Sequence, residues 1–116
     1  MYLVRERDLA GRVNKVSSNW ISKTVRQSIY NRDNRTCVYC GTTEEHAVLS
    51  LDHIEPRSEG GALCDPANLI TCCCHCNSTR QTMSLPAFQR YLATHYAILT
   101  VKDLSAKVRR MARKPL

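Results

Sequence analysis

The chain has 116 residues, which suits one hydrophobic core and excludes two full-sized ones. Lysine and arginine outnumber aspartate and glutamate by 17 to 10, giving a net charge of +7. Such a surplus favours a polyanionic partner, most often nucleic acid, although a well-solvated surface has the same composition. No apolar run approaches the roughly 20 residues that span a bilayer, so we expect no membrane partner.

Seven cysteines is a large number for this length. The chain opens without the apolar segment of a secretory signal. An odd count and the lack of an export signal favour a reducing cytoplasmic compartment, where cysteines serve as metal-binding thiolates rather than disulfides.

In chain order, residues 1–20 are mixed and polar, and we expect an N-terminal arm there. Ser22 is a suitable N-cap for a helix of about ten residues that ends near Asp33 and Asn34. The following Cys-x-x-Cys-Gly segment resembles a tight metal-binding turn, in which Gly41 lets the chain reverse.

The strongest strand candidate is residues 47–54, a β-branched and aliphatic run that Pro56 ends. An irregular loop is expected from Ser58 to Asn68. A helix should begin near His75 and end before Pro86. A core-facing helix is then predicted by the spacing of Leu85, Phe88, Leu92, Tyr96 and Leu99.

A last helix is predicted by the apolar spacing of Val101, Leu104, Val108 and Met111. Its other face is basic and carries Lys102, Lys107, Arg109, Arg110 and Arg113. We therefore expect one domain over residues 1–116, with a core at 21–84 and a helical extension with a basic tail at 85–116.

Two Cys-x-x-Cys pairs, Cys37/Cys40 and Cys73/Cys76, are separated by 32 residues. Two intervening residues let one turn direct both sulfurs at a single ion, and two such turns complete a tetrahedral zinc site. Four protein ligands leave no open position, so this zinc would be structural. Cys72 with His75 has the same spacing and is an alternative second pair. The cysteines left over are expected to be buried or half-buried thiols: Cys64, Cys72 and Cys74.

Between the two pairs lie side chains suited to phosphodiester hydrolysis. His53 has a side chain whose pKa suits a general base near neutral pH. Asp52 and Asn77 offer hard oxygen ligands, which favour Mg²⁺ or Mn²⁺ over zinc. Because adjacent strand residues point to opposite faces, Asp52 and His53 can flank one phosphate only if the strand ends or bends there, which Pro56 favours.

The arrangement of these residues resembles the HNH endonucleases, which carry a ββα-metal finger. The resemblance rests on His53, fourteen residues, Asn68, eight residues, and Asn77, where many members have histidine. The surrounding strings Asp-His-Ile-x-Pro-x-Ser-x-Gly-Gly and Asn-Leu…Cys-x-x-Cys-Asn also match. The resemblance covers about residues 20–85, and the basic tail is similar to that of bacterial and phage members.

This resemblance implies specific roles. His53 would activate water, Asp52 and Asn77 would hold one catalytic Mg²⁺ or Mn²⁺, and Asn68 would support the loop that orients His53. Family members typically leave a 5′-phosphate and a 3′-hydroxyl. Contacts with phosphate are expected from Arg57, Arg80, Arg109, Arg110 and Arg113.

The fold class expected is therefore a small α/β (α+β) domain, a ββα-metal finger stapled by a four-cysteine zinc site and flanked by N- and C-terminal helices. The expected function is metal-dependent cleavage of duplex DNA with little sequence preference, in a bacterial or phage-infected cell. Two alternatives stay open: a non-catalytic zinc-finger module that binds nucleic acid, and a nuclease acting on RNA or structured nucleic acid.

Overall fold

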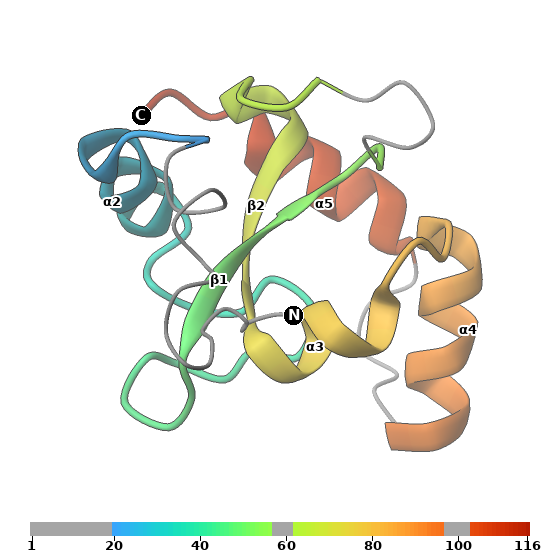
Figure 1. Ribbon diagram of the computed structural model, residues 1–116. Coiled ribbons are helices and arrows are strands. Elements are labelled where there is room, and N and C mark those ends of the chain that lie inside the picture. Colours follow the sequence, from blue (N-terminus) through green and yellow to red (C-terminus); the bar gives the residue numbers. More distant parts are fainter. Residues whose placement is uncertain (1–19, 57–61, 97–102) are drawn as a thin grey trace, which may run out of the picture.

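A two-stranded hairpin with helices on both sides forms the centre of the computed structural model, which describes residues 20–56, 62–96 and 103–116 (Figure 1). The elements in chain order are α2 (Lys23–Arg32), β1 (Leu49–His53), η2 (Pro66–Asn68), β2 (Leu69–Cys73), α3 (Cys74–Arg80), α4 (Leu85–Tyr96) and α5 (Leu104–Ala112). The expected α+β fold with a hairpin followed by helices is confirmed. The expected arm over residues 1–20 lies almost wholly outside the described residues.

The hairpin pairs β1 and β2 antiparallel, from Leu49 opposite Cys73 to His53 opposite Leu69. The expected strand at 47–54 is thus present at Leu49–His53. Its partner β2 is buried along its whole length and runs directly into α3. Because η2, β2 and α3 are consecutive, the motif residues from Asn68 to Asn77 are delivered by one continuous segment beside β1.

The two faces of the hairpin carry different side chains, as strand alternation requires. One face carries Leu51 and Leu69, which pack against side chains of α2 that include Ile29 and Tyr30. The opposite face packs with α4 and α5 and contains the larger core cluster, whose members include Ile54, Ile70, Cys72, Phe88, Leu92, Leu104 and Val108. The expected core residues Leu85, Phe88, Leu92, Leu104 and Val108 are therefore buried, and Met111 is partly buried against them. Leu99, Val101 and the side chain of Tyr96 lie outside the described part of the chain.

Helix boundaries follow local capping signals. Ser22 caps α2 by accepting a hydrogen bond from the Val25 amide at 3.1 Å, as expected. The helix expected to run from His75 to near Pro86 is shorter, because α3 ends at Arg80. Gln81 follows with φ of 50°, in the left-handed region that terminates a helix. A separate helix, α4, then begins at Leu85 and places Pro86 in its first turn, where proline is tolerated.

A buried arginine joins α2 to the hairpin and to the end of α5. Arg32 pairs with Asp33 at 2.8 Å, and both side chains are almost fully buried. The Arg32 guanidinium also donates to the carbonyl oxygens of Pro66, Leu69 and Ala112. This cross-link explains why the C-terminus lies beside α2 in Figure 1.

Candidate metal centre and active site

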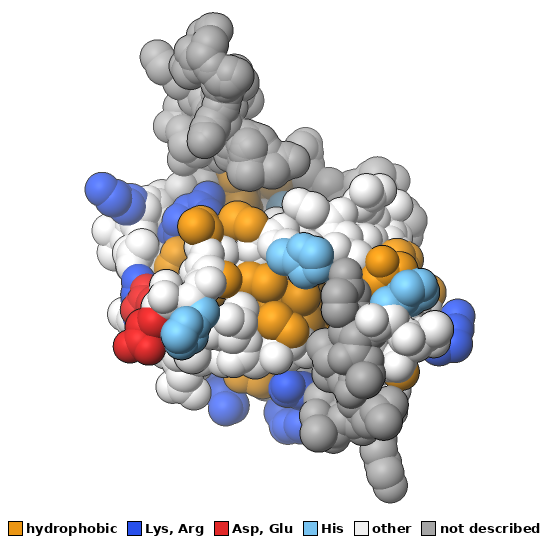
Figure 2. Space-filling view, turned by 90° about the horizontal axis from the view of Figure 1, so that it is seen from below, with side chains coloured by type: hydrophobic (Ala, Val, Ile, Leu, Met, Phe, Trp, Pro, Cys, Tyr) orange, Lys and Arg blue, Asp and Glu red, His pale blue; other side chains and the backbone are white. Residues whose placement is uncertain are grey.

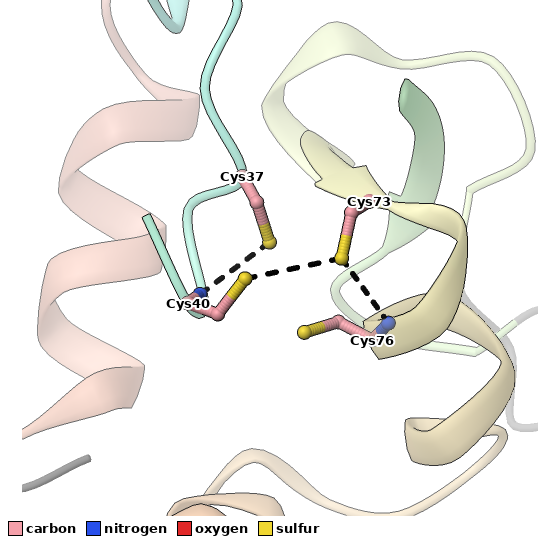
Figure 3. A group of neighbouring side chains, drawn as sticks. All are labelled: Cys37, Cys40, Cys73 and Cys76. Carbon is pink, nitrogen blue, oxygen red and sulfur yellow. Dashed lines mark hydrogen bonds between the residues drawn. The ribbon is translucent and has the colours of Figure 1, made fainter. Parts of the chain in front are cut away.

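The two Cys-x-x-Cys segments meet in one cluster. The four sulfurs of Cys37, Cys40, Cys73 and Cys76 lie within 4.8 Å of one another (Figure 3). Each pair has the same local geometry, since the Cys40 amide donates to Cys37 Sγ and the Cys76 amide donates to Cys73 Sγ, both at 3.4 Å. Gly41, with φ of 85°, lets the first turn close. The choice of Cys73 and Cys76 over Cys72 and His75 is thereby confirmed.

The donor set fits zinc. A tetrahedral ion with Zn–S distances of ~2.3 Å requires sulfurs roughly 3.8 Å apart, and Cys40 Sγ lies 3.9 Å from Cys73 Sγ. Among the four thiols, hydrogen bonding between Cys37 and Cys73 lowers the pKa of Cys73 to about 2 and raises that of Cys37 to about 12. Four thiolates this close would repel one another without a cation, so the cluster fits a structural zinc ion.

The remaining cysteines differ in their surroundings. Cys72 is fully buried and its sulfur lies 3.9 Å from Ser50 Oγ. Cys74 is half-buried. Cys64 is exposed and donates to the Trp20 carbonyl at 2.9 Å, so the expectation that it is buried or half-buried is wrong.

Asp52 lies in a buried polar network beneath α3. Its Oδ2 accepts a hydrogen bond from the Tyr39 hydroxyl and an ion-paired bond from Arg80 at 2.8 Å. Burial, together with the nearby Asp52 carboxylate, raises the pKa of Tyr39 well above its usual value, so the hydroxyl keeps its proton and acts as donor. The second carboxylate oxygen, Oδ1, has no hydrogen-bond partner among the described residues. Buried side-chain oxygens and nitrogens without a partner are known for the same residues, and Oδ1 is not one of them. Oδ1 is therefore reached by solvent.

The side chain of Asn77 also has an oxygen, Oδ1, that no described residue binds. Its Nδ2 donates to Ser50 Oγ at 2.7 Å and to the Leu51 carbonyl at 3.4 Å. Because a carbonyl only accepts, these partners identify the nitrogen and leave Oδ1 without a described partner. Asn77 touches Ser50, which shares a strand face with Asp52, so both candidate metal ligands lie on the α3 side of β1.

His53 lies at the end of β1 with a fixed ring orientation. Its Nε2 is 2.8 Å from the Leu63 carbonyl oxygen, and its ring centroid is 5.2 Å from that of Trp20. The carbonyl can only accept, so Nε2 is the nitrogen that donates in this bond, and Nδ1 is the ring nitrogen without a described partner. As the alternation of the strand requires, His53 stands on the α2 side, opposite Asp52.

Asn68 joins the two ends of the loop that follows β1. Its Oδ1 accepts from the Glu55 amide at 2.9 Å, while its Nδ2 donates to the carbonyl oxygens of Glu55 at 3.2 Å and Ala62 at 2.8 Å. The backbone carbonyl of Asn68 also accepts from the Ile54 amide at 2.8 Å. These bonds fix the segments on either side of His53 and its Leu63 partner.

Comparison with known families adds to this geometry. Residues 37–93 match the sequence model of a family described as HNH endonuclease. The matched segment begins at the first cysteine of the cluster and contains the hairpin, α3 and most of α4. Residues 37–93 form an HNH endonuclease domain. The family resemblance expected from the motifs is thus confirmed. No curated protein and no solved structure shows significant similarity to the chain.

One basic residue of the HNH domain is not where the sequence predicted. Arg80 is 1% exposed and donates to Asp52, Tyr39 and three backbone carbonyls, so it has no surface to offer to a phosphate. The expectation that Arg80 contacts DNA is wrong, because α3 turns this side chain inward beneath the hairpin. Arg57 lies outside the described residues.

Several exposed basic residues lie on α5 and just beyond it, and others lie on α2 and α4 at Lys23 and Arg90. Arg109, Arg110 and Arg113 are exposed, and Arg109 forms a 2.8 Å ion pair with Glu55, two residues beyond His53. Figure 2 shows a face on which hydrophobic side chains occupy the centre and lysine and arginine side chains lie at the margins. Arg109 is therefore the arginine of α5 that the described contacts link to the candidate active site, through Glu55.

Two side chains beside the candidate site were missed at the sequence level. Trp20 contacts the His53 ring, and its indole also faces the Arg26 guanidinium at 5.5 Å. Tyr39 lies between two zinc-ligand candidates and binds Asp52. The position of Tyr39 inside the Cys-x-x-Cys turn was an available signal, whereas nothing in the sequence connects Trp20 with His53. No helix within the described ranges is long and apolar enough to cross a membrane.

Proposed function

We propose that the HNH domain is a divalent-metal-dependent endonuclease that hydrolyses DNA phosphodiester bonds, with His53 as general base. The observation that carries this proposal is the His53 ring at the end of β1, held through Nε2 by the Leu63 carbonyl. A base needs one nitrogen free to accept a proton and a ring orientation that does not change during the reaction. The hydrogen bond to Leu63 supplies both conditions.

In this mechanism His53 Nδ1 removes a proton from a water molecule as its oxygen attacks phosphorus. The bond from phosphorus to the 3′ oxygen breaks, and the leaving oxygen takes a proton from solvent, which gives a 5′-phosphate and a 3′-hydroxyl. The imidazolium that forms is stabilised by the Nε2–H bond to Leu63, and Asn68 holds the loop that carries this carbonyl. Proton transfer of this kind contributes about 10²–10⁴ in rate.

Asp52 Oδ1 and Asn77 Oδ1 are the atoms that would hold a divalent cation. Both are hard oxygen donors on the α3 side of β1, which suits Mg²⁺ or Mn²⁺. When bound, such an ion supplies Lewis-acid stabilisation for the charge that develops on the phosphate and on the leaving oxygen. The ion bound by the cysteine cluster would have no open position and would serve the fold alone.

The substrate would lie at the C-terminal end of β1. The outer edge of the strand is covered along its length, because its carbonyl oxygens accept side-chain hydrogen bonds from Tyr30, Asn77 and Arg80. The strand ends at His53, where side chains from both of its faces lie next to each other in the chain. A phosphate at this end would face the metal ligands on one side and His53 on the other.

Duplex DNA with little sequence preference is the substrate that the charge pattern supports. Arg110 on α5 and Arg113 at the C-cap of this helix are exposed, close in sequence to Arg109, which pairs with Glu55 at the candidate site. Phosphate contacts position a nucleic acid without specifying its sequence. A second candidate function is a non-catalytic binding module, which the ion pair of Asp52 with Arg80 favours, because that pair stabilises Asp52 without any metal.

The test is incubation of the zinc-loaded protein with supercoiled plasmid and, separately, with a structured RNA, each with and without Mg²⁺ or Mn²⁺. The proposal predicts nicking or linearisation of the plasmid that requires the added metal. Plasmid binding without cleavage at any metal concentration would support the binding module, and cleavage of RNA alone would contradict the DNA assignment. EDTA is unsuitable as the metal-free condition because it also removes zinc.

A further inference from the structure

A buried arginine connects the candidate metal ligand with the rest of the site. The Arg80 guanidinium donates from Nη1 to Asp52 Oδ2 at 2.8 Å and to the Tyr39 hydroxyl oxygen at 3.0 Å. The same side chain donates to the carbonyl oxygens of His53, Ile54 and Met83 at 2.8 to 2.9 Å. Arg80 therefore contacts the end of β1 at three consecutive residues.

The helix that carries Arg80 also carries two other residues of the site. Asn77 lies one helical turn earlier on α3, and Cys76, in the first turn, belongs to the cysteine cluster. Tyr39, the second donor to Asp52, lies in the other Cys-x-x-Cys turn. Arg80 and Tyr39 thus tie the orientation of the Asp52 carboxylate to the two turns that the cluster holds together.

The two oxygens of Asp52 are consequently in different environments. Oδ2 accepts from Tyr39 and Arg80 inside the protein, whereas Oδ1 is reached by solvent. A carboxylate with one oxygen fixed by two donors cannot rotate freely, so the direction of the other oxygen is also fixed. Hydrogen bonds of this kind orient metal ligands, and their loss typically weakens metal affinity by about 10–100-fold.

We propose that Arg80 and Tyr39 are positioning residues that hold Asp52 Oδ1 toward a divalent cation shared with Asn77 Oδ1. This inference rests on the proposed function, since it needs a metal at Asp52. It assigns to Arg80 a role inside the protein in place of contact with DNA. A purely structural arginine would stabilise the fold and leave metal affinity unchanged.

The chain contains a matched control for that distinction. Arg32 is as deeply buried as Arg80, pairs with the neighbouring Asp33 and donates to three carbonyls, yet it lies on α2 and contacts neither Asp52 nor Asn77. Arg32→Met and Arg80→Met both remove a buried, paired guanidinium, and we expect both to lower the thermal midpoint. Only Arg80→Met should also change the affinity for metal.

The experiment measures Mn²⁺ binding to the zinc-loaded protein by electron paramagnetic resonance, without nucleic acid. We expect Asp52→Asn to abolish the site, Arg80→Met to raise the Kd tenfold or more, and Arg32→Met to change it less than twofold. Arg80→Lys, which keeps the charge, should recover part of the loss. Tyr39→Phe removes only the hydroxyl and should raise the Kd several-fold, which keeps the test available if Arg80→Met does not fold.

The outcomes separate the two proposals. If the wild type binds no Mn²⁺, or if Asp52→Asn binds it equally well, the metal site of the proposed function is wrong. If Asp52→Asn abolishes binding while Tyr39→Phe and either Arg80 variant bind like the wild type, the positioning role is overturned. Equal losses of affinity in Arg80→Met and Arg32→Met would overturn it too, because they would reflect general destabilisation.

Discussion

Replacing Asn68 by alanine tests whether the loop beside His53 is held as the structure indicates. The substitution removes three side-chain hydrogen bonds, two to the Glu55 backbone and one to the Ala62 carbonyl. Each such bond contributes ~0.5–1.5 kcal/mol net, and the half-buried site favours the lower half of that range. We therefore expect the ordered loop to lose about 2 kcal/mol relative to opened states.

A loss of that size raises the population of open states about 30-fold, since 1.4 kcal/mol corresponds to a factor of ten. The Glu55 amide should exchange with solvent faster by a similar factor, because its hydrogen-bond acceptor is gone. Displacement of a catalytic group by about 1 Å can cost roughly 100-fold in rate. We therefore expect kcat for plasmid cleavage to fall about 10–100-fold with little change in DNA affinity.

The assay combines amide hydrogen exchange with single-turnover plasmid cleavage. Asn68→Asp is an informative companion, because it keeps the acceptor for the Glu55 amide but places a carboxylate against two carbonyls. Asn31→Ala is the control. Asn31 lies near the C-terminal end of α2, and its side chain accepts a solvent-exposed hydrogen bond from Arg35. Wild-type exchange at Glu55 together with wild-type cleavage in Asn68→Ala would refute the reasoning.

Further predictions concern zinc and DNA binding. Cys37→Ser should lose zinc and unfold, as metal analysis and circular dichroism would show; a folded, zinc-free variant would be contrary to the account. Because the pKa values of Cys37 and Cys76 are raised, both carry protons near neutral pH, so zinc binding should release at least two protons to an indicator dye, and zinc should dissociate as pH falls. If Arg110 and Arg113 each contact phosphate, alanine at either position should reduce the salt slope of DNA binding by ~0.9, and an unchanged slope would rule out that contact.

The cysteine site illustrates how much could be predicted from sequence. Two Cys-x-x-Cys pairs constrain their own geometry, so a four-cysteine cluster could be predicted from the sequence. Spacing alone left Cys72 with His75 as an alternative second pair, and the structure decides between them. The helix start at Ser22 and the apolar spacing of α4 and α5 are equally local signals. The strand β2 was harder to delimit, because a short strand buried on both faces has no alternating pattern.

The inward position of Arg80 could not be predicted from α3 alone, because its acceptors come from other segments of the chain. Its spacing of four residues from Cys76 places it on the buried face of the helix, but the sequence does not show which groups lie there. The helix ends at Arg80, and its guanidinium finds acceptors on β1 and in the Cys37–Cys40 turn, which are distant in sequence. Contacts such as Trp20 with His53 and Nε2 with Leu63 likewise arise only from tertiary packing.

The most direct test of the account is the single-turnover rate of plasmid cleavage by His53→Ala, with Mg²⁺ or Mn²⁺ present and zinc retained. The account predicts a loss of about 10²-fold or more, with folding, zinc content and DNA affinity unchanged. Cleavage by His53→Ala at the wild-type rate would contradict the central claim that this imidazole is the general base.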